Sequence, residues 1–414
     1  MEVKPGYKPT EVGVIPEEWD VERLGELSEF VTSGSRGWAQ FYSESGALFI
    51  RSQNVRDGRL SFEDVQYVSP PTGAEGNRTK VRLNDLLITI TGNSVGNVAL
   101  VDQTFDETYI SQHVGLVRLK EPNRGAYICR YLSPNSPGNP QIAGSQSGQS
   151  KPGLNLQNLK DFLIALPSSS KELQAIATAL SDVDGLLGGL DRLIAKKRDL
   201  KQAAMQQLLT GQNRLPGFQD AWEVKRLGEI CEIAMGRTPP RLNQVYWGHG
   251  YKWLSIADLQ TKVVSDSKEE ITELAASMMT IIPKGTLLMS FKLSLGRLCF
   301  AGCDLFTNEA ICSFNKLQAN AEFLYYVLGR TDFSFYGKQA VKGYTLNKQS
   351  LKIIEVTLPP LPEQTAIAEV LTDLDAELAA LDQRREKTRA LKQAMMQELL
   401  TGRTRLVSPK EAHA

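Results

Sequence analysis

The chain has 414 residues, more than one typical hydrophobic core accommodates, so we expect two to four folded units. Its 47 Lys and Arg residues balance 47 Asp and Glu residues, so any surface for nucleic acid must come from local clustering of positive charge. Five irregularly spaced cysteines and an N-terminal segment without an apolar leader favour a reducing cytoplasmic environment, and no apolar run approaches the ~18 residues that a membrane span needs.

The first region alternates short β-type runs with turns. The runs include ALFIRS, DLLITITG and HVGLVRL, and Gly, Asn, Pro and Ser separate them. One helix is expected near GAYICRYL. We therefore predict a mixed, mostly β domain over residues 1–167.

A long helix is predicted next, over residues 168–211. Ser169 and Glu172 have the spacing of a capping box, and Gly211 stands where a glycine commonly ends a helix. The seam of a coiled coil is indicated by apolar residues at seven-residue intervals, with a second set three positions later: Leu173, Leu180, Leu187 and Ile194, then Ile176, Val183 and Leu190.

The same order then repeats. Residues 212–360 contain the β-type runs YKWLSIADL, GTLLMSFKL and AICSFNKL, with one helix near AEFLYYVLG. Residues 361–406 form a second long helical region, in which Pro362 suits a first turn and Gly402 suits a C-terminal cap. Residues 407–414 are left as a tail.

The two halves are copies of one unit. LKQAAMQQLLTGQNRL begins at Leu200 and LKQAMMQELLTGRTRL begins at Leu391, which is 191 residues later (391 − 200). WDVERLGEL at Trp19 and WEVKRLGEI at Trp222 are 203 residues apart (222 − 19), so the helical frame is constant and the inserted domain varies. This pattern predicts an α+β fold with two pseudo-repeated, mostly β domains and two long helices. Ordinary bundle helices remain an alternative to a coiled coil.

The arrangement resembles the specificity subunit of type I restriction-modification systems. The resemblance covers essentially the whole chain and rests on LPPLPEQTAIAEVL, LKQAMMQELLTGRTRL and GRTPPRLNQVYWGHGYKWLSIADL, with SGSRGWAQFYSESGALFIRSQNV and TGNSVGNVAL in the first half. It implies two target recognition domains, each reading one half of a split DNA site. It also implies that the two helices pack as an antiparallel coiled coil that sets the spacer between the half-sites. The first helix departs from the pattern, because it begins LPSSSKELQAIA and lacks the Pro-Glu-Gln form.

The resemblance also implies partners. These are double-stranded DNA, two methyltransferase (modification) subunits and, through the complex, restriction subunits, with no membrane. S-adenosylmethionine, ATP and Mg are expected on the partner subunits, so we expect no cofactor in this chain.

Motifs for catalysis are not found in the sequence. No phosphate-binding GxxxxGK[ST] loop is present. Residues 92–96 fit the G-x-S-x-G pattern of hydrolases. Residues 292–296 in the second copy lack the first glycine, and no histidine follows them before the chain's tail, which favours a tight loop near phosphate. Cys299, Cys303 and Cys312 have no nearby histidine to complete a zinc site, so buried thiols are expected. We predict neither catalytic nor metal-binding residues.

Loops at four corresponding positions in each half hold the residue types that read DNA. Arg and Lys suit guanine, Asn and Gln suit adenine, Asp and Glu suit cytosine, and hydroxyl groups hold phosphates. The candidates in the first half are Ser35, Arg36, Trp38, Arg51, Gln53, Asn54, Asn93, Ser94, Asn97, Lys151 and Asn155. The candidates in the second half are Arg237, Thr238, Arg241, Ser255, Asp258, Lys292, Ser294, Arg297, Lys342, Tyr344 and Asn347. For any single residue the alternative is a solvated charge or, for Trp38, core packing.

The repeated helical phrase predicts two similar docking surfaces for two modification subunits. Its apolar positions are Leu200, Met205 and Leu208 in the first copy and Leu391, Met395, Met396 and Leu399 in the second. Two other functions stay open. A fused modification enzyme would methylate DNA by itself, and a coiled-coil scaffold would show no preference between DNA duplexes.

Overall fold

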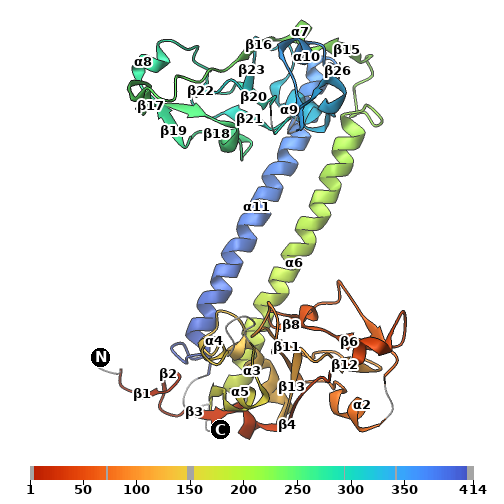
Figure 1. Cartoon of the computed structure of the whole chain (residues 1–414), viewed down its shortest axis with the longest axis vertical. Helices are drawn as coiled ribbons and strands as arrows, with labels where there is room; N and C mark the ends of the chain where they lie inside the picture. Colours follow the sequence, from red (N-terminus) through yellow and green to blue (C-terminus); the bar gives the residue numbers. More distant parts are fainter. Residues whose placement is uncertain (1–3, 71–72, 147–152, 293, 341–342, 408–414) are drawn as a thin grey trace. The chain divides into compact units, whose positions relative to one another are not determined.

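The computed structural model describes residues 4–70, 73–146, 153–292, 294–340 and 343–407. The chain forms two compact units, shown with their elements in Figure 1. Unit 1 comprises Met1–Asp191 and Gln383–Ala414, and unit 2 comprises Arg192–Asp382. Each unit thus contains one mostly β domain and a segment of each long helix, whereas the boundaries drawn from the sequence assigned each helix to a domain of its own.

Unit 1 is built around two four-stranded sheets. The first has the order β11 (Val98–Leu100), β10 (Leu86–Thr89), β13 (Val114–Leu119) and β4 (Ser28–Ser33). The second has the order β12 (Thr108–Ile110), β6 (Ala47–Ile50), β9 (Tyr67–Val68) and β5 (Tyr42–Ser43). The two-stranded pairs are β1 (Tyr7–Thr10) with β2 (Gly13–Pro16), β3 (Asp20–Arg23) with β14 (Leu163–Leu166), and β7 (Val55–Arg56) with β8 (Arg59–Leu60).

Helices flank these sheets. They are α1 (Leu24–Leu27), α2 (Ala74–Thr79), α3 (Gly125–Leu132), α4 (Pro140–Gly144), α5 (Leu156–Asp161) and the long α6 (Ser170–Leu208). Strand β10 is buried along its whole length because side chains on alternate faces enter different cores. Leu86 and Ile88 pack with α3, the start of α6 and the end of the second long helix, whereas Leu87 packs between the two sheets.

Unit 2 repeats this plan. Its main sheet has the order β16 (Glu232–Met235), β23 (Ile311–Asn315), β20 (Leu287–Ser290), β21 (Leu298–Ala301) and β18 (Val263–Val264). The second sheet has the order β19 (Glu269–Ile271), β17 (Trp247–Leu254) and β22 (Phe306–Thr307), and the pairs are β15 (Glu223–Arg226) with β26 (Glu355–Leu358) and β24 (Lys338–Ala340) with β25 (Gly343–Thr345). The helices are α7 (Leu227–Ile230), α8 (Glu273–Ala276), α9 (Ala321–Arg330), α10 (Lys348–Lys352) and α11 (Leu361–Leu399).

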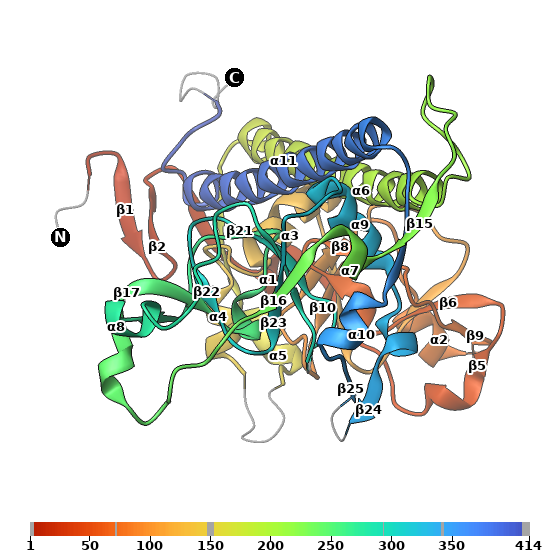
Figure 2. The ribbon, with the colours of Figure 1, turned by 90° about the horizontal axis from the view of Figure 1, so that it is seen from above.

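The two long helices pair in antiparallel fashion, and Figures 1 and 2 show their segments side by side. In unit 2 Lys197 pairs with Glu377 at 2.7 Å, and Lys201, further along α6, pairs with Asp375, which comes earlier in α11. In unit 1 Lys392 pairs with Asp184 at 2.8 Å. The α+β class and the antiparallel pairing predicted from the sequence are therefore confirmed.

Each unit closes the pairing with a buried clasp at a helix start. In unit 1, the clasp consists of Arg405, which follows α11, Glu172 in the first turn of α6, and Trp19. The Arg405 guanidinium donates to both oxygens of Glu172, with Nη2 to Oε2 at 2.7 Å, and the Trp19 indole Nε1 donates to the same carboxylate at 3.4 Å. The Glu172 side chain is only 1% exposed.

The clasp of unit 2 has the same three residue types at the repeated positions. Arg214, which follows α6, donates from Nη2 to Oε2 of Glu363 at 2.6 Å, and Trp222 Nε1 donates to that oxygen at 3.2 Å. Glu363 is fully buried. Each clasp therefore ties the end of one long helix to the start of the other.

Candidate nucleic-acid interface

A tight turn in unit 1 brings the predicted DNA-reading loops together. This hub turn, residues 111–114, joins β12 to β13 and is closed by the Val114 N–H, which donates to the Ser111 carbonyl at 3.0 Å. Three loops bond to its backbone: Gly34 N to Val114 O at 3.3 Å, Ser111 N to Ile50 O at 2.8 Å and Ile90 N to His113 O at 2.9 Å. The segment that precedes Asn155 joins them because Leu154 N donates to Ile90 O at 2.8 Å.

Unit 2 builds the same arrangement on a hub turn at residues 308–311. The Ile311 N–H donates to the Asn308 carbonyl at 3.2 Å. The loops attach through equivalent bonds: Gly236 N to Ile311 O at 3.0 Å, Asn308 N to Leu254 O at 2.9 Å, Phe291 N to Ala310 O at 2.9 Å and Leu346 N to Phe291 O at 3.0 Å. The loop positions inferred to correspond in the sequence are therefore held by the same backbone contacts in both units.

Glycine is required where the first loop crosses each hub turn. A Cβ added to Gly34 would lie 2.2 Å from the carbonyl carbon of Ser111, and one added to Gly236 would lie 2.2 Å from the carbonyl oxygen of Asn308. Both distances are far below van der Waals contact with atoms of the main chain, which cannot move aside. These two glycines let the first loop approach the turn.

Several predicted residues of unit 1 lie on this surface. Arg36 and Asn93 are exposed, and Ser94 is partly exposed. Ser35 accepts a hydrogen bond from Arg78 of α2, which also donates to the Ser33 carbonyl at 3.0 Å and so holds the first loop in place. Arg36, Asn93 and Ser94 are therefore the best-placed side chains of the set predicted in unit 1.

Other predicted residues of unit 1 have structural partners. Arg51 pairs with Asp64 at 2.8 Å, and Gln53 donates to the same carboxylate. Asn97 donates from Nδ2 to the Val55 carbonyl at 3.1 Å. Asn155 caps α5, since its side chain accepts from the Asn158 N–H at 2.8 Å.

Two predictions in unit 1 need correction. Trp38 is 2% exposed and stacks on Phe49 with ring centroids 5.2 Å apart, so its ring belongs to the core and is not available to bases. Asn54 is 3% exposed, and its amide donates to the carbonyls of Ser61 and Asp64 at 2.9 and 2.8 Å. Both side chains therefore support their loops from the interior of the domain and do not present themselves to DNA.

Unit 2 gathers cationic side chains from two of its loops. Arg241 lies over the rings of Trp247 and Trp253, with its guanidinium carbon 4.1 and 4.8 Å from their centroids, and it also pairs with Glu269. Lys292 is partly exposed in the loop after β20. Aromatic faces hold a planar guanidinium in a fixed position, which suits contact with phosphates or guanine.

The remaining predictions in unit 2 divide in the same way. Arg297 is exposed, and Arg237 is exposed with its Nη1 donating to the Met278 carbonyl at 3.4 Å. Structural bonds occupy three others: the Ser255 hydroxyl donates to Asp258 at 2.6 Å, and Asn347 caps α10. The backbone carbonyl of Ser294 accepts a hydrogen bond from Ser290, which shapes the loop after β20. Lys151 and Lys342 lie outside the described residues, as does the side chain of Tyr344.

Sequence reasoning missed the hub-turn side chains themselves. Gln112, His113 and Glu309 are exposed at the point where the loops meet. Thr238 donates a hydrogen bond to Glu309, which lowers the pKa of that carboxyl from its ordinary value, and the charges of Lys292 and Arg241 lower it further. The sequence does carry a signal for them: a short polar segment interrupts two apolar runs at the same place in both copies, in YISQHVGL and in FTNEAICS.

The comparisons with known proteins agree with the duplication of the chain. The profile of the family described as "Type I restriction modification DNA specificity domain" matches twice, at residues 16–194 and 219–389. The chain belongs to this type I DNA specificity family. DNA sequence recognition for a type I restriction-modification system is thus its function, as the sequence predicted, and nothing in the comparisons favours a bare scaffold or a fused modification enzyme.

Individual relatives match along the whole length. The putative type I restriction enzyme MjaX specificity subunit of Methanocaldococcus jannaschii is 25% identical over 97% of both chains, and the MjaVIII specificity subunit of that organism is 22% identical over 95% of this chain and 94% of its own. A type I restriction-modification S subunit from M. genitalium shares the fold, with a TM-score of 0.60 at 16% identity over 96% of this chain and 98% of that one.

The predicted docking residues of this specificity protein need correction. Leu208 belongs to the core of unit 2, with Met205 packed against it, and Met396 and Leu399 belong to the core of unit 1, with Met395 packed against it. These side chains attach the helix ends to their own domains. In contrast, Leu200 is 47% and Leu391 is 55% exposed, so these two equivalent positions remain candidates for docking.

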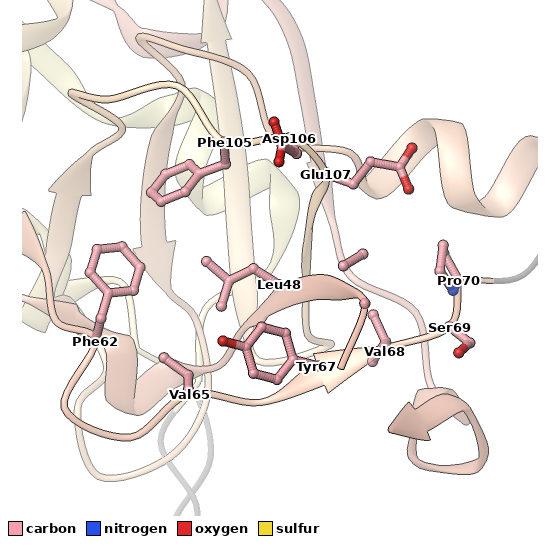
Figure 3. A pocket seen from close by; sticks show the side chains of 12 residues that line it. Leu48, Phe62, Val65, Tyr67, Val68, Ser69, Pro70, Phe105, Asp106 and Glu107 are labelled. Carbon is pink, nitrogen blue, oxygen red and sulfur yellow. The ribbon is translucent and has the colours of Figure 1, made fainter. Parts of the chain in front are cut away.

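A separate pocket in unit 1 lies outside the hub region. Its volume is about 720 Å³, and Figure 3 shows Leu48, Tyr67 and the facing rings of Phe62 and Phe105 within it. The ring centroids of this last pair are 5.4 Å apart. Asp106 and Glu107 also line the pocket, and their charge opposes phosphate, so we assign it no part in DNA binding.

Among the residues that the structure describes, no group of three or more His, Cys, Asp or Glu is arranged to hold a metal ion. In the same part of the chain, none of the helices combines the length and the apolar character that a membrane span requires. Burial raises the pKa of the Cys299 thiol to about 12, which keeps it in the neutral form.

Proposed function

We propose that each hub region reads one half of a split DNA site. The observation that carries this proposal is the duplicated hub, in which the same backbone bonds present different side chains. Unit 1 offers Arg36, Asn93 and Gln112, whereas unit 2 offers Arg241, Lys292 and Glu309. Because base recognition depends on donor and acceptor patterns, two such sets would select two different half-sites.

We further propose that the chain acts without catalytic activity of its own and within a larger complex. Modification subunits, bound as two copies, would supply methyl transfer with S-adenosylmethionine, and restriction subunits would supply ATP- and Mg-dependent cleavage. The chain would work in the cytoplasm, where its DNA lies. The exposed leucines at the equivalent positions 200 and 391 support two similar docking surfaces.

The test is methylation sequencing of DNA modified by the chain together with its modification subunit. We expect a split motif whose two halves respond separately to the two units. Arg36→Ala with Asn93→Ala should relax one half-site, and Arg241→Ala with Lys292→Ala should relax the other. A change in both halves from either pair would contradict the assignment of one half-site to each unit.

Two further arms test the alternatives. The chain alone, given DNA and methyl donor, should transfer no methyl group, and transfer would identify a fused modification enzyme. In a gel shift at moderate salt, the complex should prefer duplexes that carry the motif over a scrambled duplex. Equal binding to both would support a scaffold. Salt should weaken binding to both duplexes because phosphate contacts release counterions.

A further inference from the structure

One position recurs at the centre of both hubs. Gln112 is the second residue of the hub turn in unit 1, and Glu309 is the second residue of the hub turn in unit 2. Both side chains are exposed. The first, second and third loops attach to the backbone of both turns through hydrogen bonds and so lie around these two positions. The two units therefore differ, at the same backbone position, by an amide in one and a carboxylate in the other.

The surroundings of Glu309 are unusual for a carboxylate. Thr238 from the first loop donates a hydrogen bond to Oε2, and Lys292 and Arg241 are close enough to act on its charge. All three neighbours are candidates for DNA contact. A carboxylate placed among these candidates would repel phosphates, so it is better suited to accept a hydrogen bond from a base than to contact the DNA backbone.

The chemistry of the two side chains suggests which bases they read. An ionised carboxylate only accepts hydrogen bonds, so it matches the N4 amino group that cytosine presents in the major groove. A carboxamide both donates and accepts, so it matches N7 and the N6 amino group of adenine. In unit 1 the Gln112 amide nitrogen lies 3.1 Å from His113 Nε2, and His113 Nδ1 in turn contacts the Thr91 hydroxyl, which orients the amide.

We propose that the second residue of each hub turn selects a base: Glu309 reads a cytosine in one half-site, and Gln112 reads an adenine in the other. This inference rests on the proposed function, that the chain reads a split site with one unit for each half. A purely structural role for Glu309, anchoring the first loop through Thr238, is the competing explanation. The two explanations differ in what Glu309→Gln does, because the amide oxygen still accepts from Thr238.

The experiment is methylation sequencing of the complex formed by the full chain and its modification subunit. Glu309→Gln should change one position of one half-site from a C·G pair to an A·T pair. Glu309→Ala should reduce discrimination there by about 5- to 150-fold, the range for one good side-chain–base pair. Gln112→Glu should produce the reverse change, A·T to C·G, in the other half-site. Glu273→Gln, which removes the same charge from α8 away from the hub, is the matched control and should leave the motif unchanged.

The outcomes separate the inference from the function beneath it. If the wild-type complex methylates no split motif, the proposed function fails. If the wild-type motif is split but Glu309→Gln and Gln112→Glu both leave every base preference unchanged, this inference is overturned. If Glu309→Gln does not assemble, Gln112→Glu and Gln112→Ala decide the matter alone, and unchanged preference in them overturns the inference equally.

Discussion

The clasp of unit 1 allows a quantitative prediction for Arg405→Met. The wild-type guanidinium donates to both oxygens of a carboxylate that is 1% exposed, and it also pairs with Glu18. These contacts raise the pKa of Arg405, so it stays charged throughout the accessible range. Methionine keeps much of the volume and removes the charge, which leaves Glu172 buried without its cation. Breaking a buried pair in this way costs about 3–5 kcal/mol of folding free energy.

Hydrogen exchange measured by mass spectrometry is the suitable assay, because it reports on each unit separately. In Arg405→Met, peptides from the start of α6 should exchange faster, by roughly 150- to 5,000-fold if exchange follows the opening equilibrium. Peptides from unit 2 should keep their rates. The matched control is Arg214→Met. It should speed exchange in peptides from the start of α11 in unit 2 and leave unit 1 unchanged, because Glu363 is just as buried there as Glu172 is in unit 1.

A double variant tests the physical cause. In Glu172→Met with Arg405→Met no buried charge remains, so most of the lost stability should return. A loss below ~1 kcal/mol in Arg405→Met would refute the reasoning, since that is the range of an exposed ion pair. Equal losses in the single and double variants would also refute it, because they would indicate lost packing as the cause.

Three further outcomes follow from the structure. Trp38→Ala should lower the free energy of unfolding by about 3–5 kcal/mol in urea titration, because the ring is in the core; a loss of DNA binding with unchanged stability would contradict this. Burial raises the pKa of Asp85 against the opposing charge of Arg118, so Arg118→Met should raise it further. Because the folded variant then binds the proton more tightly than the unfolded chain, its stability should fall relative to wild type as pH rises from about 4 to 7, and equal deficits across that range in urea titrations would disagree. Leu391→Asp should cost one bound modification subunit in native mass spectrometry and Leu200→Asp the other; loss of both from either variant would exclude separate docking surfaces.

Much of the fold could be predicted because repetition and periodicity are local properties of the sequence. The long helices were expected within residues 168–211 and 361–406, and they span Ser170–Leu208 and Leu361–Leu399. The loops were located because glycines and polar residues interrupt apolar runs. Their gathering around one turn was not predictable, since it depends on hydrogen bonds between segments distant in sequence, such as Gly34 to Val114.

The errors at the candidate site have one physical reason. Residue type predicts what a side chain can bind but not which way it points, so Trp38 and Asn54 were proposed as DNA contacts although both are buried. Met396 and Leu399 were likewise assigned to a partner because apolar spacing on a helix does not distinguish a docking surface from an internal core. Glu309 was missed because an acidic side chain repels phosphates, and only the polar segment that recurs between the same two apolar runs marks its position.

By itself, the sequence determined that this protein is a duplicated, two-unit DNA specificity protein, because the repeat and its motifs persist along the whole chain. Only the tertiary structure decided which side chains reach the surface and which atoms meet. The clasps show the division clearly: Trp, Glu and Arg stand at repeated positions in the sequence, but Arg405 meets Glu172 only because the helices pair in opposite directions. A linear pattern records spacing along the chain, whereas burial and contact depend on how separate segments pack.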